Sequence, residues 1–248
     1  MKLKVLSYNI HKGFDHWGRF SLEAMRAALH ETHADLVFLQ EVVGENKSLL
    51  EHFKLHAPNE RQFEYLADSL WPHFSYGKNA VFPDRHHGNA ILSKYPIVSS
   101  HNLDLSTNNY ESRGMLHAQI DIVPESHSLH VFNTHLNLLA GSRMRQMGKI
   151  IDWIKTQLSS EHSFLLAGDF NDWNQGLSDP LKTHLTALES FDHLHGGHAQ
   201  SFPAFWPKLC LDRIYFRGLR VNSAKVLKGS PWSELSDHLP LLAEFETH

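Results

Sequence analysis

Short apolar runs alternate with polar segments along the whole chain, and the spacing of apolar residues separates strands from helices. Runs of about four to eight apolar residues are typical of buried strands, whereas apolar residues three or four positions apart indicate one helix face. Strands are predicted at residues 3–10, 35–40, 73–77, 90–93, 97–105, 115–123, 129–134, 164–167, 211–216, 221–227 and 241–245. Helices are predicted around Leu22, Met25 and Leu29, with Ser21 as N-cap; around Phe63, Leu66, Ala67 and Leu70; and around Met147, Ile150, Ile151, Ile154 and Leu158.

The order of these elements predicts the fold class. Several strands follow one another without a helix between them, which breaks the strand–helix rhythm of a doubly wound sheet. We therefore expect an α/β protein of the α+β type, with mixed sheets and helices outside. No linker rich in Pro, Gly or Ser and no internal repeat interrupts the 248 residues, so one domain over 1–248 is expected.

Composition narrows the range of partners. Hydrophobic residues make up 42% and charged residues 20% of the chain, as in ordinary globular proteins. The net charge of −4 provides no general attraction to nucleic acid or anionic lipid, so a polyanionic substrate requires a local basic patch or a metal ion. The single cysteine, Cys210, excludes an internal disulfide and a cysteine-rich zinc module. We read no signal peptide, transmembrane stretch or coiled-coil heptad, and we expect a cytoplasmic monomer.

Polar residues that could carry chemistry stand at the ends of several apolar runs. Asp237 and His238 precede the last predicted strand, where such a pair could bind a metal or take a proton from water. Glu41 follows the predicted strand 35–40, and a carboxylate there is costly to bury unless it is paired or bound to a cation. The alternative for Glu41 is that the strand has simply reached the surface.

Two further clusters have the same character. Asp169 and Asn171 share one face of an extended segment and could hold a water molecule and a substrate oxygen, although Gly, Asp and Asn also form turns. Asn133 and His135 likewise share a strand face with Asn137. His135 could donate a hydrogen bond to a developing phosphate charge, or it could be structural.

An acid within one predicted strand and a base before another are further candidates. Asp212 lies within an apolar strand and could accept a hydrogen bond from a histidine, fixing the tautomer of a general base. A local ion pair with Arg213 or an edge-strand position is the alternative. Arg113 suits bidentate contact with phosphate, but an ion pair with Glu111 explains it equally well.

Seven motifs, in this order, resemble those of the endonuclease/exonuclease/phosphatase superfamily of metal-dependent phosphohydrolases. They are Ser7-Tyr8-Asn9-Ile10, Leu39-Gln40-Glu41-Val42, Gly88-Asn89-Ala90-Ile91-Leu92-Ser93, Asn133-Thr134-His135-Leu136, Gly168-Asp169-Phe170-Asn171, Leu211-Asp212-Arg213-Ile214 and Ser236-Asp237-His238-Leu239-Pro240. Residues 9–13 and 86–93 are also similar to those of the small bacterial YbhP-like branch.

The resemblance implies a DNase I-like four-layer sandwich of two mixed sheets, with the site at one edge. It implies a divalent-metal-dependent phosphodiester hydrolase that acts on nucleic acid, a phospholipid head group or a small phosphodiester. Mg²⁺ or Mn²⁺ is expected on Glu41, near Asn9 and Asp237. The implied catalytic residues are His238, Asp169, Asp212, His135 and Asn171; the implied substrate-binding residues are Asn9, Asn89, Arg113 and Asn133.

Two alternatives compete with this hypothesis. The segment 192–198 contains His193, His195 and His198, which could hold zinc in a hydrolase of another class. The adjacent Gly196 and Gly197, without apolar flanks, favour a mobile surface loop there. The second alternative is a non-catalytic module that binds a phosphate-containing ligand on the same fold. Basic residues are scattered, and the aromatic segments 14–20 and 202–206 could stack on bases, touch a lipid or only pack.

Overall fold

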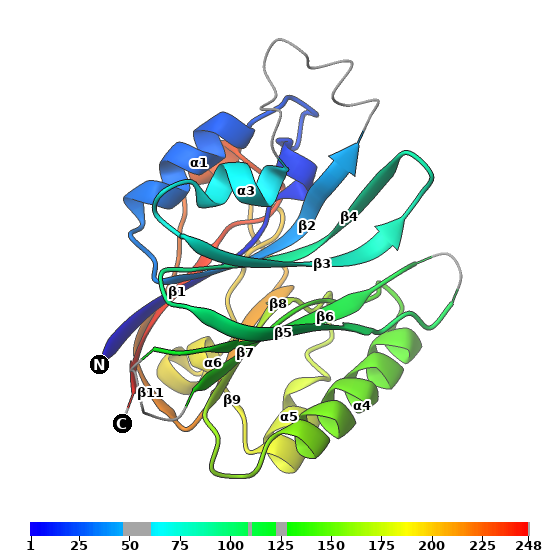
Figure 1. The fold of residues 1–248 in the computed structure, drawn as a ribbon, viewed down its shortest axis with the longest axis vertical. Coiled ribbons are helices and arrows are strands. Elements are labelled where there is room, and N and C mark those ends of the chain that lie inside the picture. Colours follow the sequence, from blue (N-terminus) through cyan, green and yellow to red (C-terminus); the bar gives the residue numbers. More distant parts are fainter. Residues whose placement is uncertain (47–60, 109–110, 123–127, 248) are drawn as a thin grey trace.

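Two six-stranded sheets stacked face to face form the centre of the molecule, with helices outside (Figure 1). The structure is a computed structural model and describes residues 1–46, 61–108, 111–122 and 128–247. The predicted arrangement of two mixed sheets with helices outside is confirmed. Among the described residues, no helix combines the length and apolar character needed to cross a membrane.

Each sheet contains one parallel pair of strands within an otherwise antiparallel order. The first sheet runs β11 (Leu219–Val226), β12 (Leu241–Thr247), β1 (Lys2–Asn9), β2 (Leu36–Asn46), β4 (Arg85–Ser93) and β3 (His73–Val81). The second runs β5 (Ile97–Asp104), β6 (Gly114–Ile120), β7 (Leu129–His135), β8 (Phe164–Asp169), β10 (Asp212–Arg217) and β9 (Leu188–Glu189). The parallel pairs are β1–β2 and β7–β8.

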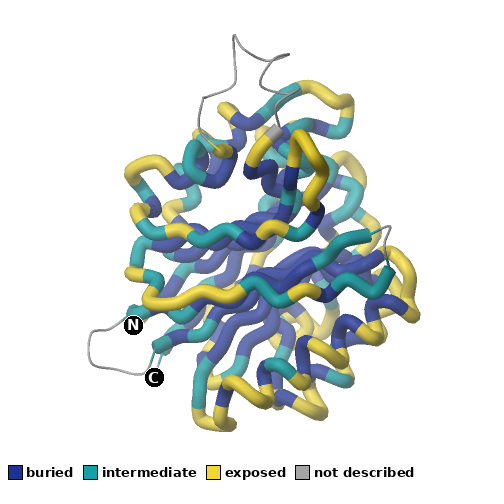
Figure 2. The backbone as a smooth tube through the Cα atoms, turned by 45° about the vertical axis from the view of Figure 1, so that its right-hand side comes forward, coloured by how far each residue is buried: buried dark blue, intermediate teal, exposed yellow. Residues whose placement is uncertain are grey.

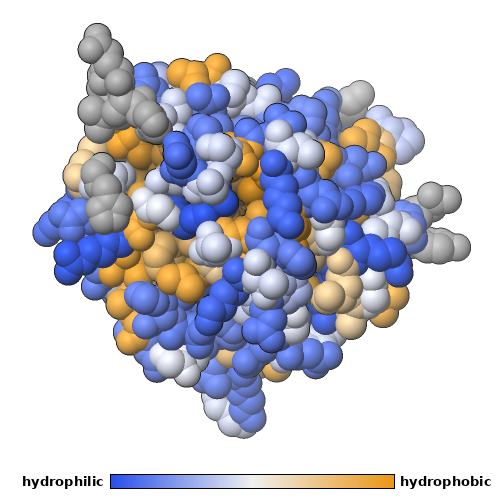
Figure 3. Space-filling view, turned by 90° about the horizontal axis from the view of Figure 1, so that it is seen from below, coloured by the Kyte–Doolittle hydropathy of each residue, from blue (hydrophilic) through white to orange (hydrophobic). Residues whose placement is uncertain are grey.

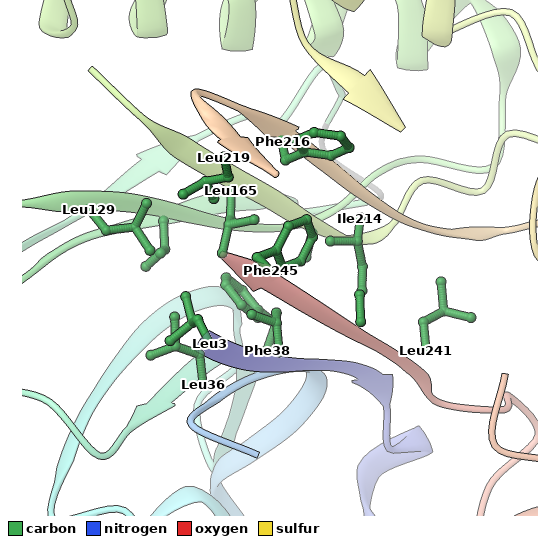
Figure 4. Packing of buried hydrophobic residues seen from close by; sticks show 14 of the residues in the cluster. Leu3, Leu36, Phe38, Leu129, Leu165, Ile214, Phe216, Leu219, Leu241 and Phe245 are labelled. Atoms are coloured by element: carbon green, nitrogen blue, oxygen red, sulfur yellow. The ribbon is translucent and has the colours of Figure 1, made fainter. Parts of the chain in front are cut away.

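Alternation of side chains along the strands separates the hydrophobic layers. Val5 of β1 belongs to the layer between the sheets, whereas its neighbour Leu6 belongs to the outer layer. The inner layer includes Leu3, Phe38, Leu165 and Ile214, whose packing is shown in Figure 4.

Helices cover the outer faces. The helices α1 (Leu22–Glu31) and α3 (Gln62–Ala67) cover the first sheet, and α4 (Ala140–Gln157) and α5 (Ser178–Leu185) cover the second. The short helix α6 (Ser190–His195) and the 3₁₀ turns η1 (His11–Gly13) and η2 (Trp232–Glu234) complete the elements. The buried segments follow the sheets and the inner helix faces (Figure 2). Hydrophilic side chains cover much of the face seen from below, with hydrophobic ones between them (Figure 3).

All predicted strands and the three predicted helices are present, with shifted ends. β2 extends to residue 46 through an irregularity in its pairing with β4, and position 123, predicted as the end of a strand, lies outside the described residues. Ser21 precedes α1 without a side-chain capping bond, because its hydroxyl donates to the carbonyl oxygen of Leu235. The interpretation of residues 192–198 as a mobile loop is wrong, because α6 occupies most of the segment and is anchored by buried Phe191.

Candidate active site

Sheet pairing brings polar residues from both sheets to one edge. Asn9 ends β1, and His135 and Asp169 end the parallel strands β7 and β8, where they are register partners. Asp212 begins β10 directly opposite Asp169. The approach of β8 to β7 requires Gly168, since a Cβ atom there would lie 1.9 Å from the carbonyl oxygen of Thr134.

Asn9 connects the two sheets at this edge. Its Nδ2 donates to Asp169 Oδ2 at 3.1 Å and to Glu41 Oε1 at 3.5 Å. Its Oδ1 accepts from the backbone N–H of His11 at 3.0 Å. The hydroxyl of Ser236 donates to the carbonyl oxygen of Asn9 at 2.8 Å, which attaches the loop that carries Asp237 and His238. Residues far apart in the sequence therefore form one network.

A buried chain of ionisable groups runs from Asp212 through His238 to Asp169. His238 Nδ1 lies 2.9 Å from Asp212 Oδ2, and His238 Nε2 lies 3.7 Å from Asp169 Oδ2. The hydroxyl of Ser201 also donates to Asp212 Oδ2, and the ring of Phe202 lies 4.9 Å from the imidazole, centroid to centroid. These contacts fix both the tautomer and the orientation of the ring.

The two carboxylates determine the charge of this chain. Burial by itself would lower the pKa of His238, but the negative charges of Asp212 and Asp169 raise it to about 10. Burial also raises the pKa of Asp169, against the effect of the His238 imidazolium. The imidazole is therefore protonated at neutral pH in the absence of other ligands, and a proton can be exchanged between the two groups.

Glu41 stands in an irregular part of β2, with its backbone in the left-handed region at φ 56°. Its Oε2 lies 2.9 Å from the ammonium of Lys12. Burial would raise the pKa of Glu41, but nearby positive groups, including Lys12, hold it well below the usual range. His11, Lys12 and Asn171 also have positive φ, and such strain is common at functional sites.

His135 lies near the carboxylates of Asp169 and Glu41. Its Nε2 is 3.5 Å from Asp169 Oδ2, and burial places its pKa well below the ordinary value, so the ring is neutral at pH 7. Arg113 lies close enough to contribute to this lowering, and its guanidinium also lies 3.6 Å from Glu111, the alternative considered from the sequence. Its buried Nε has no hydrogen-bond partner among the described residues.

Asn133 and Asn89 lie buried between the two sheets. Asn133 is fully buried and donates to the carbonyl oxygens of Leu39 and Ala90, both at 2.8 Å, while its Oδ1 accepts from Gln40 Nε2 at 2.8 Å. Asn89 Nδ2 donates to the carbonyl oxygens of Gly114 and Asn133 at 3.1 and 3.3 Å. Because these amide groups bond to the protein itself, both residues tie the sheets together.

Asn171 and Asp237 border the network. The backbone N–H of Asn171 donates to Asp169 Oδ1 at 2.9 Å, which is the Asx turn weighed from the sequence. Asn171 Nδ2 donates to the carbonyl oxygen of Leu136 at 3.0 Å. Asp237 Oδ1 lies 3.9 Å from His11 Nδ1.

Sequence reasoning missed the part played by Lys12, which it counted only among the scattered basic residues; the signal was its position within residues 9–13.

Two buried carboxylate oxygens at this edge of the sheets are suitable ligands for a cation. Glu41 Oε2 and Asp212 Oδ1 are buried and have no hydrogen bond of normal geometry in the described part of the chain. Carboxylate oxygens of this kind suit Mg²⁺, which needs few protein ligands. Within the described ranges, the group of three with metal-binding spacing is Asp169, Asp212 and His238, whose ligand atoms lie within 4.8 Å of one another.

The histidines of the alternative zinc site do not converge. His193 is exposed, His195 Nε2 lies 3.0 Å from the carbonyl oxygen of Ala224, and His198 Nδ1 lies 3.0 Å from Glu189 Oε2. Since each ring has a different environment, the three cannot hold one ion as placed.

Fold and site together define a two-sheet sandwich of the DNase I-like class with an acid–imidazole network at one edge. The chain belongs to the endonuclease/exonuclease/phosphatase family, whose model matches residues 6–238. The uncharacterized protein YbhP of Escherichia coli K12 is 41% identical over 242 residues, which cover 97% of this chain and 95% of that protein.

Solved structures share the fold at low sequence identity. An endonuclease/exonuclease/phosphatase from Beutenbergia cavernae has a TM-score of 0.79 and 21% identity, covering 99% of this chain and 72% of that chain. TDP2 from D. rerio, complexed with a single-strand DNA product, has a TM-score of 0.68 and 17% identity, covering 99% of both chains. The DNase I-like fold predicted from the sequence motifs is confirmed.

Proposed function

We propose that the protein is a divalent-metal-dependent phosphodiester hydrolase in which residues 1–248 act as one catalytic domain. The observation that supports this most strongly is the buried chain of Asp212, His238 and Asp169 beside Glu41. A phosphodiester is anionic and resists attack by water, so its hydrolysis needs charge neutralisation and proton transfer. This edge of the sheets offers side chains for both.

Glu41 is the proposed ligand of Mg²⁺ or Mn²⁺, with Asn9 and Asp237 near the ion, directly or through water. The buried Oε2 of Glu41 supports this assignment, since it already contacts a positive charge, the ammonium of Lys12, at 2.9 Å. When bound, the cation neutralises negative charge on the phosphate group. The group of Asp169, Asp212 and His238 is a weaker candidate, because both ring nitrogens of His238 already face carboxylate oxygens.

His238 and Asp169 are the proposed groups that prepare water for in-line attack. Asp212 holds Nδ1 of His238, which leaves Nε2 directed toward Asp169 for proton exchange. Asp169 is oriented by Asn9 Nδ2 and by the backbone N–H of Asn171. These bonds keep both groups in place, so little reorganisation is needed when the proton moves.

Neutral donors next to this pair are proposed to contact the phosphate. His135 has a neutral ring and can donate one N–H to developing negative charge, and the amide of Asn9 can do the same by giving up its longer contact, 3.5 Å, with Glu41. Arg113, with its unpaired Nε, is proposed to bind the phosphate group. Asn89 and Asn133, expected from the resemblance to bind substrate, are assigned instead to holding the two sheets together.

The substrate is proposed to be a phosphodiester of nucleic acid, of a phospholipid head group or of a small molecule. The aromatic segments predicted at 14–20 and 202–206 meet at the rings of His16 and Phe205, whose centroids are 5.6 Å apart. Trp17 and Trp206 are exposed by 73% and 63%, and the second segment contacts the site through Phe202. These rings suit a base, a lipid or another apolar group attached to the phosphate. The cytoplasmic location and monomeric state stay predictions.

Hydrolysis of bis(p-nitrophenyl) phosphate with Mg²⁺, Mn²⁺ or EDTA tests the proposal. Turnover should require the metal and should fall by about 100-fold or more in His238→Ala. His193→Ala is the matched control, because His193 is exposed and lies outside the network. A non-catalytic module that binds a phosphate-containing ligand is the alternative; it predicts Mg²⁺ binding by calorimetry without turnover of this diester or of DNA, RNA and phospholipid substrates.

A further inference from the structure

A second network of ionisable and hydroxyl side chains lies around α5, β9 and α6. Glu189 ends β9, His198 follows α6, Ser178 opens α5 and Tyr215 belongs to β10. Glu189 Oε2 lies 3.0 Å from His198 Nδ1, and His198 Nε2 lies 3.3 Å from Ser178 Oγ. The phenol oxygen of Tyr215 lies 2.9 Å from Ser178 Oγ. None of these four residues belongs to the candidate active site.

The contacts of this network allow one consistent set of donors and acceptors. Glu189 Oε2 also accepts from the backbone N–H of Asp192 at 2.8 Å, and Oε1 accepts from the hydroxyl of Ser190 at 3.3 Å, as expected for an ionised carboxylate. In this arrangement His198 Nδ1–H donates to Glu189, and Nε2 is left as the acceptor. The hydroxyl of Ser178 donates to this Nε2, and its oxygen accepts from Tyr215.

This order is that of a nucleophile, a base and an orienting acid. The base and the acid are protected from water, since the side chains of His198 and Glu189 are 7% and 2% exposed. Ser178 is partly exposed, so its oxygen is the member that a small molecule can reach.

A cavity of about 180 Å³ adjoins the serine. Ser178, Glu189 and Tyr215 line it together with Lys182 and His193. Asp179 and Asp192 also line this cavity, so it is largely polar and suits a small acyl group. Ser178 is the first residue of the eight-residue helix α5, where the N–H groups of Ser178 and Asp179 have no acceptor within the helix and Pro180 has no N–H. Such N–H groups stabilise an oxyanion.

We propose that Ser178, His198 and Glu189 form a second catalytic site that hydrolyses small carboxylic esters. Ser178 Oγ attacks the carbonyl carbon while its proton passes to His198 Nε2. The bond to the alcohol oxygen breaks, and the leaving alcohol takes this proton. Water then attacks the acylated Ser178 by the same route, which releases the carboxylic acid and restores the serine. The overall reaction consumes one ester and one water and yields one acid and one alcohol.

Labelling of the intact protein with a fluorophosphonate probe, mapped by mass spectrometry, tests this site. The probe should modify Ser178, and His198→Gln should slow the modification by about 100-fold or more. Ser159 is the matched control, because its hydroxyl also lies near a histidine, 2.8 Å from His162 Nδ1. Ser159→Ala should leave the labelling of Ser178 unchanged.

Hydrolysis of p-nitrophenyl acetate gives the second measurement. Ser178→Ala should abolish the enzyme-dependent rate while turnover of bis(p-nitrophenyl) phosphate stays as in the parent protein. Failure of the probe to modify Ser178 in the folded parent protein would overturn the proposal whatever the variants do. Parent-like ester hydrolysis by folded Ser178→Ala would overturn it as well, leaving the network a purely structural one.

Discussion

Lys12→Met should tighten the binding of Mg²⁺. The ammonium of Lys12 lies 2.9 Å from Glu41 Oε2, the carboxylate oxygen proposed to bind the ion. Two cations cannot both make close contact with this oxygen, so a bound Mg²⁺ has to displace Lys12. The lysine therefore weakens metal binding by the free energy of the ion pair that is lost.

The distance and the exposure set the size of this effect. Two unit charges about 4 Å apart interact by about 1 kcal/mol in water and by several times more in a low-dielectric interior. The side chain of Lys12 is 45% exposed and that of Glu41 is 19% exposed, so solvent screens much of the attraction. A loss of about 1 kcal/mol corresponds to a dissociation constant about fivefold lower in Lys12→Met.

Isothermal titration calorimetry with MgCl₂ at constant ionic strength measures the change. Lys94→Met is a matched control, because Lys94 Nζ forms a similar ion pair with Asp35 at 3.1 Å, and it should bind Mg²⁺ like the parent protein. Glu41→Gln should lose most of the affinity. Unchanged or weaker Mg²⁺ binding in folded Lys12→Met would show that the ammonium and the metal do not compete for Glu41.

Three further predictions concern the site and its support. Asp212→Asn should lower phosphodiester turnover by about 100-fold or more and should lower the pKa of His238 from about 10, which NMR titration measures. Asn133→Ala should cost about 1–3 kcal/mol of unfolding free energy in urea, because two buried carbonyl oxygens lose their donor. Burial lowers the pKa values of His117 and His130 to about 4, so unfolded chains bind more protons below pH 6.5. The unfolding free energy should therefore fall between pH 6.5 and 4, by about 2 kcal/mol after allowance for partial exposure, and less in His117→Phe.

The strands and most site positions could be predicted because both depend on local order in the sequence. A short apolar run marks a strand such as β1, and the polar residue at its end, Asn9, falls at the sheet edge whatever the other strands do. The short elements α5, β9 and α6 escaped prediction. Their few apolar residues, such as Leu181 and Phe191, acquire a partner only when other segments pack against them.

The role of a polar side chain within a strand could not be predicted, because it depends on how the sheets stack. Asn133 and His135 are two residues apart and share a strand face, yet Asn133 bonds to backbone groups between the sheets and His135 reaches Asp169. The contact between Glu41 and Lys12 could not be predicted from the sequence either. Lys12 reaches the carboxylate through two consecutive residues with positive φ, His11 and Lys12 itself, and strained turns of this kind leave no periodic signal.

The site depends on both sheets, and its catalytic geometry is therefore coupled to the packing between them. Each sheet contributes one parallel pair whose polar ends meet at the shared edge, and Asn9 spans the gap by donating to Asp169 at 3.1 Å. A shift of one sheet by about 1 Å would break this bond and separate Glu41 from the Asp169–His238 pair. The buried amides of Asn89 and Asn133 oppose such a shift, since each bonds to groups of the opposite sheet. Their polar side chains thus serve the chemistry by fixing the distance between the two halves of the site.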